Sequence, residues 1–101
     1  MKSYEFDNSD RHVLMGAIEL WGEDAQRNQA IEEMAELVVE LARIPRGRTD
    51  DFDMVNEIAD VRIVLRQLEM MWGEEEVAER VEKKMERFER LILECGGAPH
   101  G

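Results

Sequence analysis

Residues 50–72, DDFDMVNEIADVRIVLRQLEMMW, contain the clearest signal of the fold. Apolar side chains recur there at steps of three and four residues, as at Val61, Val64 and Leu68, which places them on one face of an α-helix. Across the chain, Ala, Leu, Met, Glu and Arg dominate, and β-branched runs with a period of two residues are absent. The sequence therefore predicts an all-α protein.

Glycine and proline mark where the predicted helices end. Gly22 and Gly73 each follow an apolar run, and Pro45 and Gly47 predict the one internal loop. The predicted helices span about residues 10–21, 24–43, 50–72 and 74–94. Their candidate N-caps are Asn8, Ser9 or Asp10 for the first helix and Thr49 or Asp50 for the third. The short connections predict an antiparallel four-helix bundle that forms one domain over residues 1–101, with frayed ends at 1–8 and 96–101.

The charge balance excludes two classes of partner. The chain has 13 Lys and Arg against 24 Asp and Glu, a formal net charge of −11 over 101 residues. Binding to a nucleic-acid polymer or to an anionic membrane surface depends on an excess of basic side chains, so neither partner is expected. A chain of this length buries only a modest core by itself, and oligomerisation would enlarge that core.

The remaining composition predicts a cytoplasmic protein. Cys95 is the single cysteine, so the chain has no internal disulfide, and one thiol with two histidines cannot form the usual Cys/His zinc site. The N-terminus lacks the apolar core of a signal peptide, and no stretch approaches the roughly 18 apolar residues that a membrane span needs.

Two acidic clusters carry the chemistry, Glu32-Glu33-x-x-Glu36 on the second predicted helix and Glu57-x-x-Asp60 on the third. Acids at positions i and i+3 lie on one face of a helix, and two such pairs facing each other could offer four oxygen ligands to Mg²⁺ or Mn²⁺. On the second helix these acids fit a solvated stripe equally well. That stripe holds Glu32, Glu33, Glu36 and Glu40 and lies opposite Ala30, Met34, Val38 and Leu41.

The third helix is more informative because its acids fall on the apolar face. Helical stepping places Glu57 among Val61, Val64 and Leu68, and it places Asp60 beside Val64. A carboxylate on such a face is costly unless a cation or hydrogen-bond donors compensate it. A metal site and a structural acid pair both satisfy that requirement, and the residues alone leave the two alternatives open.

The paired motif also resembles a known family. Glu32-Glu33-x-x-Glu36, followed after residues 37–56 by Glu57-x-x-Asp60, is similar to the EExxE…ExxD signature of the MazG-like all-α nucleoside triphosphate pyrophosphohydrolases. Trp21-Gly22 before Gln26 and Gln29, and the segments 30–37 and 57–61, look like the short single-domain, phage-type branch. The resemblance covers roughly residues 18–93.

The resemblance implies a site and a reaction. The resemblance implies that Mg²⁺ is bound by Glu33, Glu36, Glu57 and Asp60. It also implies that the protein hydrolyses a nucleoside triphosphate to a nucleoside monophosphate and pyrophosphate. This reaction serves nucleotide-pool house-cleaning. A further carboxylate can orient or deprotonate the attacking water, and Glu32 and Glu36 are the candidates. The resemblance also implies a homodimer or homotetramer.

Substrate contacts are predicted from aromatic, amide and basic residues. Trp21 could stack on a nucleobase, and Gln29, one turn before Glu33, could hydrogen-bond a base or ribose. Lys84 and Arg87 on the fourth helix lie on a basic strip that could reach the phosphates. The alternatives are an ordinary core or interface tryptophan and ordinary surface ion pairs.

Two rival classes of site lack their motifs in this sequence. A di-iron carboxylate bundle needs Glu-x-x-His pairs, which are absent, and a P-loop needs Gly-x-x-x-x-Gly-Lys, which is also absent. A non-catalytic acidic adaptor or DNA mimic fits the charge. It fits the placement of Glu57 less well, because a mimic displays its acids to water.

Overall fold

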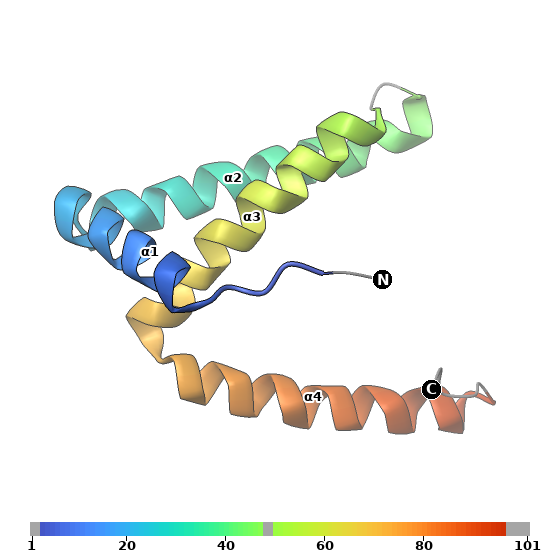
Figure 1. Ribbon diagram of the computed structural model, residues 1–101. Helices are drawn as coiled ribbons and strands as arrows, with labels where there is room; N and C mark the ends of the chain where they lie inside the picture. Colours follow the sequence, from blue (N-terminus) through green and yellow to red (C-terminus); the bar gives the residue numbers. More distant parts are fainter. Residues whose placement is uncertain (1–2, 48–49, 97–101) are drawn as a thin grey trace. The chain divides into compact units, whose positions relative to one another are not determined.

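The computed structural model describes residues 3–47 and 50–96, and these form four α-helices and one short 3₁₀ turn (Figure 1). The helices are α1 (Asn8–Trp21), α2 (Glu23–Arg43), α3 (Asp51–Trp72) and α4 (Glu74–Glu94), and the turn η1 (Ile44–Arg46) follows α2. No strand occurs within the described residues, so the all-α prediction is confirmed. The part of the chain that the structure describes contains no helix long and apolar enough to cross a membrane.

Helix α1 begins two residues before its predicted start. Its N-cap is Asp7, whose carboxylate accepts a hydrogen bond from the Asp10 backbone N–H at 2.8 Å. The Asp10 carboxylate in turn accepts one from the Asp7 backbone N–H at 3.1 Å, which completes a capping box. The predicted caps Asn8, Ser9 and Asp10 therefore lie inside the helix, because sequence alone did not show which acid faces which free N–H.

The other helix ends follow the predicted residues closely. Asp50 caps α3, with its carboxylate accepting a hydrogen bond from the Asp53 backbone N–H at 2.7 Å, while the alternative cap Thr49 lies outside the described residues. Gly22 and Gly73 separate consecutive helices at φ angles of 91° and 138°. Side chains other than glycine rarely adopt such angles, which explains why glycine stands at both positions.

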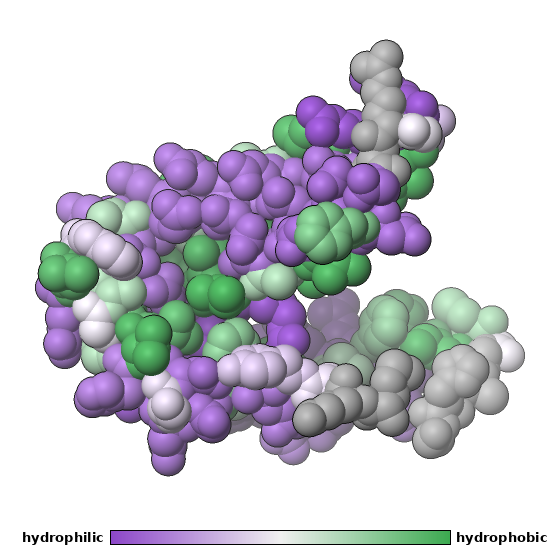
Figure 2. Space-filling view, turned by 45° about the horizontal axis from the view of Figure 1, so that its top comes forward, coloured by the Kyte–Doolittle hydropathy of each residue, from purple (hydrophilic) through white to green (hydrophobic). Residues whose placement is uncertain are grey.

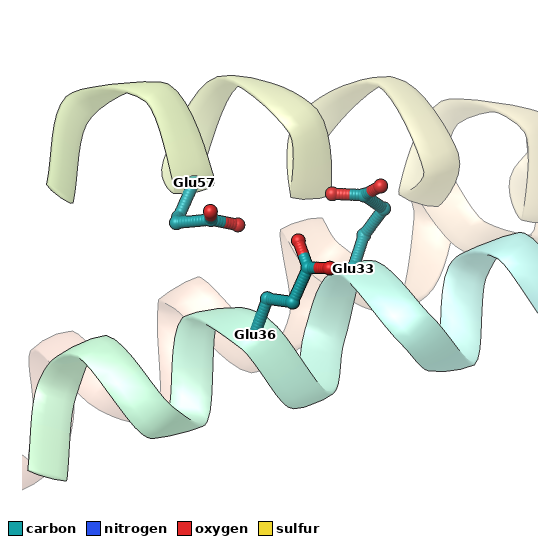
Figure 3. A group of neighbouring side chains, drawn as sticks. All are labelled: Glu33, Glu36 and Glu57. Atoms are coloured by element: carbon teal, nitrogen blue, oxygen red, sulfur yellow. The ribbon is translucent and has the colours of Figure 1, made fainter. Parts of the chain in front are cut away.

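The chain forms two compact units, Met1–Met71 and Trp72–Gly101, and the first unit contains α1, α2 and α3. Helices α2 and α3 run side by side in opposite directions (Figures 1 and 3). Helix α1 packs against α2 (Figure 1). The extended residues before α1 also contact α3, because the Arg62 guanidinium donates a hydrogen bond to the Tyr4 carbonyl oxygen at 2.6 Å and lies 5.5 Å from the centre of the Phe6 ring.

The buried core is small and lies where the three helices meet. Five apolar residues are buried in the described part of the chain, namely Leu14, Ile18, Ala30, Val61 and Val64. Many large apolar side chains stay exposed, and Figure 2 shows apolar patches among hydrophilic residues on one face of the molecule. On α2, Val38 is 64% exposed and Leu41 is 51% exposed.

This burial corrects the predicted orientation of α2. The inner face of the helix carries Gln26 and Ala30, which are buried, and Glu33 and Glu40, which are half-buried. The prediction of one solvated acidic stripe is therefore right for Glu32 and Glu36 and wrong for Glu33 and Glu40. Of the apolar residues that were expected to face the core, Ala30 is buried and Met34 is half-buried, whereas Val38 and Leu41 are exposed.

Helix α4 makes up most of the second unit and is strongly amphipathic. Its apolar side chains follow the predicted steps of three and four residues, and several are about half exposed. These side chains are Val77, Val81, Met85, Phe88 and Ile92. The basic residues Lys84 and Arg87 are exposed on the same helix.

Candidate metal centre and adjoining cavities

Three carboxylates converge between α2 and α3. Glu33 and Glu36 come from α2 and Glu57 comes from α3, and their side chains point toward one another across the two helices (Figure 3). One oxygen of each carboxylate lies within 4.8 Å of the corresponding oxygens of the other two. Three like charges at such separations repel one another, so the arrangement favours a bound cation or a shared proton.

The antiparallel register places the two acidic motifs against each other in pairs. The Glu33 carboxyl lies beside Asp60, and the Glu57 carboxyl lies beside Glu36, each close enough to share a proton. Asp60 is therefore adjacent to the three-carboxylate group through Glu33. Its side chain is exposed, whereas Glu33 and Glu57 are half-buried. The predicted burial on the apolar face thus holds for Glu57 and fails for Asp60.

The electrostatics follow from this crowding. Loss of hydration, followed by the negative charges of Asp60 and Glu36, raises the pKa of Glu33 above its ordinary value. Loss of hydration also raises the pKa of Glu57, with further contributions from the charges of Glu36, Asp60 and Glu33. Both groups are thus held in a setting that disfavours their anions unless positive charge is added.

Two carboxylate oxygens in this group lack a partner. Glu33 accepts a hydrogen bond from the Gln29 side-chain amide at 2.7 Å through Oε1, but its Oε2 is buried without a donor. Glu57 Oε2 is buried without a donor as well. Buried polar atoms are nearly always partnered, and carboxylate oxygens are the ligands that Mg²⁺ and Mn²⁺ prefer. The donor set and the two unpartnered oxygens therefore fit a hard divalent cation.

A first cavity of about 260 Å³ opens beside Glu33 and Asp60, and we call it the amide cavity. It is lined by Trp21 and by every glutamine of the chain, Gln26, Gln29 and Gln67. The remaining lining residues are apolar and come from α1 and α3, namely Leu14, Ala17, Ile63 and Val64. The predicted substrate residues Trp21 and Gln29 thus share one cavity with two of the predicted metal ligands.

A second cavity of about 300 Å³ opens beside Glu36 and Glu57, and we call it the Arg43 cavity. Arg43 lines it and donates a hydrogen bond to the Glu40 carboxylate at 3.0 Å. Among the described residues that line the two cavities, Arg43 is the only cation. The carboxylate group therefore borders an amide-rich cavity that has no cation in its lining and a second cavity in which Arg43 accompanies three glutamates.

Three other predicted residues are not members of this group. Glu32 is exposed on α2 and belongs to neither the carboxylate group nor the linings of the two cavities. Lys84 and Arg87 lie on α4 in the second unit, where the neighbouring Lys83 pairs with Glu79 at 3.2 Å. Their predicted role toward phosphate stays a prediction.

Sequence reasoning missed the buried position of Gln67 and gave Arg43 no role. It also included Gln26 in the resemblance without predicting its burial. A signal for Gln67 was present, because helical stepping places it on the same face as Val64 and Val61. A polar residue on that apolar face needs a compensating partner or ligand, as was argued for Glu57. Arg43 had no comparable signal, since a basic residue in the last turn of a helix is common.

Comparison with protein-family models, with curated proteins and with solved structures gives no match for this chain.

Proposed function

We propose that this protein is a divalent-cation-dependent nucleoside triphosphate pyrophosphohydrolase of the MazG-like kind, using Mg²⁺ or Mn²⁺. The observation that carries the proposal is the carboxylate group of Glu33, Glu36 and Glu57, with its two buried oxygens that lack donors. Isolated acidic clusters are common on helical surfaces. Buried carboxylate oxygens without partners are not, because each costs stability unless a ligand supplies what is missing.

The acids would share the work of holding the metal and activating water. Glu33, Glu36, Glu57 and the adjacent Asp60 would bind the metal, which supplies charge neutralisation for the polyphosphate and lowers the pKa of a water molecule. Glu36 is the better candidate to accept the proton of that water, because it belongs to the group, whereas Glu32 lies outside it. The attack breaks the anhydride bond between the α- and β-phosphates and yields a nucleoside monophosphate and pyrophosphate.

The two cavities adjoin the carboxylate group and would provide room for such a substrate. The Arg43 cavity offers a positive side chain for the terminal phosphates, and a guanidinium is well suited to phosphate oxygens. The amide cavity begins at Glu33 and Asp60 and extends to Trp21, so the nucleoside would lie there. A ligand cavity lined mainly by apolar groups with a few polar ones is typical of small-molecule sites.

We further propose that the active form is a homodimer or homotetramer. The described residues bury only five apolar side chains while large apolar residues of α2 and α3 stay exposed. Patches of that kind are typical of surfaces that a partner covers. A second copy of the chain would enlarge the small core that a 101-residue protein can form alone.

The test is pyrophosphate release from a panel of ribo- and deoxyribonucleoside triphosphates with Mg²⁺, and again with EDTA. We expect release that EDTA abolishes and that Glu57→Gln lowers by more than about 100-fold, beyond the effect typical of groups that only support a metal ligand. The matched control is Glu19→Gln, the same change on an exposed acid of α1. If no nucleotide is hydrolysed by the folded protein, the proposal is wrong and an acidic adaptor becomes the better hypothesis.

A further inference from the structure

Gln26 and Gln67 are the two buried polar residues of the described chain, and both line the amide cavity. Gln26 is 8% exposed and Gln67 is 4% exposed. Neither side chain has a hydrogen-bond partner among the described residues, whereas the third glutamine of the cavity, Gln29, donates to Glu33. The buried side-chain atoms that lack a partner among the described residues are Glu33 Oε2 and Glu57 Oε2, so the unpartnered amide groups of Gln26 and Gln67 open into the cavity, where a ligand can reach them.

The chemistry of an amide restricts what could satisfy these groups. Each glutamine offers a carbonyl oxygen that accepts and an NH₂ group that donates, and neither carries charge. Their complement is a neutral group with both donors and acceptors on one edge. A phosphate has acceptors alone and would be served by cations, and none lines this cavity among the described residues. The polyphosphate therefore belongs nearer the carboxylate group and Arg43.

We propose that Gln26 and Gln67 bind the hydrogen-bonding edge of the substrate's nucleobase and thereby determine which base is accepted. The inference rests on the proposed function and names the residues that select the substrate. Gln26 reaches the cavity from α2 and Gln67 reaches it from α3, so a base between them is held from two elements of the first unit. Trp21 lines the same cavity from α1 and offers a flat surface on which the base can stack.

The experiment compares kcat/KM for the four common bases in the wild type, Gln26→Met and Gln67→Met. Methionine keeps the length and the helix preference of glutamine but removes the donor and the acceptor. We expect kcat/KM for the preferred base to fall by about 10- to 100-fold, since a hydrogen bond is lost and the base edge is left unpaired. The preference among bases should shrink with it.

Inorganic tripolyphosphate separates base recognition from metal and phosphate binding. Its inhibition constant should stay within about two-fold of the wild-type value in both variants, because it has no base to lose. Asn28→Ala, an exposed amide of α2 outside both cavity linings, is the matched control and should leave every value unchanged. Variants that keep the wild-type ranking and rates would overturn the inference while the proposed function stands.

Two further outcomes complete the test. If the methionine variants do not fold, the wild type is assayed with a triphosphate whose base is an apolar isostere without edge donors or acceptors. A kcat/KM equal to that of the natural nucleotide overturns the inference, and a loss of at least 10-fold supports it. If the wild type hydrolyses no nucleotide, the proposed function fails and the inference fails with it.

Discussion

Helices α2 and α3 carry acids at the same i, i+3 spacing. The sequence predicted correctly that Glu57 of α3 is on the buried face, but it mispredicted part of the buried face of α2. Each helix supplies one half-buried and one exposed acid, Glu33 and Glu36 on α2 and Glu57 and Asp60 on α3. On α3 the buried valines flank the acid, so the apolar pattern shows which way Glu57 faces. On α2 the same pattern is right for the buried Ala30 and wrong for Val38 and Leu41, which are exposed.

The difference shows that a hydrophobic helix face need not be buried within one chain, and the proposed oligomer would bury it between chains. Val38 and Leu41 mark a surface that stays exposed in the isolated chain. The inward face of α2 is instead set by its antiparallel register with α3, which pairs Glu33 with Asp60 and Glu36 with Glu57. Spacing along each helix predicts the two pairs, and the register between helices decides which acids meet.

The largest effect on activity should appear when two acids of α2, Glu36 and Glu32, are substituted one at a time and compared. We expect Glu36→Gln to lower pyrophosphate release by more than about 100-fold, because the variant loses an oxygen of the carboxylate group and a candidate base. Glu32→Gln should retain at least about half of the wild-type rate, since Glu32 is exposed and outside the group. Initial rates at saturating Mg²⁺ measure both.

The opposite ranking of the two variants would assign the activation of water to Glu32 instead of Glu36. A severe loss in Glu32→Gln with an active Glu36→Gln would show that water is activated by Glu32. It would also show that helix α2 presents a different face in the active assembly from the one in the isolated chain.

The next effect concerns the carboxylates of both helices together, as a dependence of stability on pH and metal. Burial and like charges raise the pKa of Glu33 and Glu57 in the folded state above the ordinary value of 4.5. The folded protein therefore binds more protons than the unfolded chain, and stability falls as pH rises from about 4.5 through the raised pKa values. Saturating Mg²⁺ should reverse that loss and raise Tm by on the order of 10 °C at neutral pH.

Thermal melts from pH 4.5 to 7.5, with EDTA or with Mg²⁺, measure this dependence. Glu57→Gln is the informative variant, because it should be more stable than the wild type in EDTA at neutral pH and should gain little from Mg²⁺. The general repulsion of an acidic chain affects both proteins, so the difference between their pH slopes isolates the site. Equal slopes and equal gains from Mg²⁺ would show that the carboxylate group binds no cation.

Features that depend on residues close together in the sequence were predicted well. Helix composition, glycine stops and caps act locally, so the four helices and most of their ends were predicted within two residues. Glu33, Glu36 and Glu57 meet as the resemblance implied, and Trp21 and Gln29 lie in one cavity beside them. The arrangement of α4 in a bundle and the roles of Lys84 and Arg87 stay predictions.

What the sequence could not supply depends on contacts between helices. The burial of Gln67 points to a site only because residues of α1 and α2 line the same cavity, since a single glutamine on an apolar face has several ordinary explanations. The exposure of Asp60 depends on how the helices pack together, which helical stepping does not specify. The N-cap at Asp7 depends on a reciprocal pair of hydrogen bonds that Asn8 or Ser9 could have replaced.

The smallest effect distinguishes an inner from an outer valine on the two helices. Val61 of α3 is 8% exposed and Val38 of α2 is 64% exposed. Val61→Ala removes two buried carbons and should lower the free energy of unfolding by about 1.5 kcal/mol at every protein concentration. Val38→Ala should change that free energy by less than about 0.5 kcal/mol in the dilute monomer and weaken self-association instead.

Urea unfolding at several protein concentrations and sedimentation velocity separate the two effects. If the Val38→Ala variant associates as the wild type does, the outer face of α2 is not part of the subunit interface. The second copy would then have to cover the exposed apolar residues of α3. Among these, Phe52 is 73% exposed and Val55 is 62% exposed.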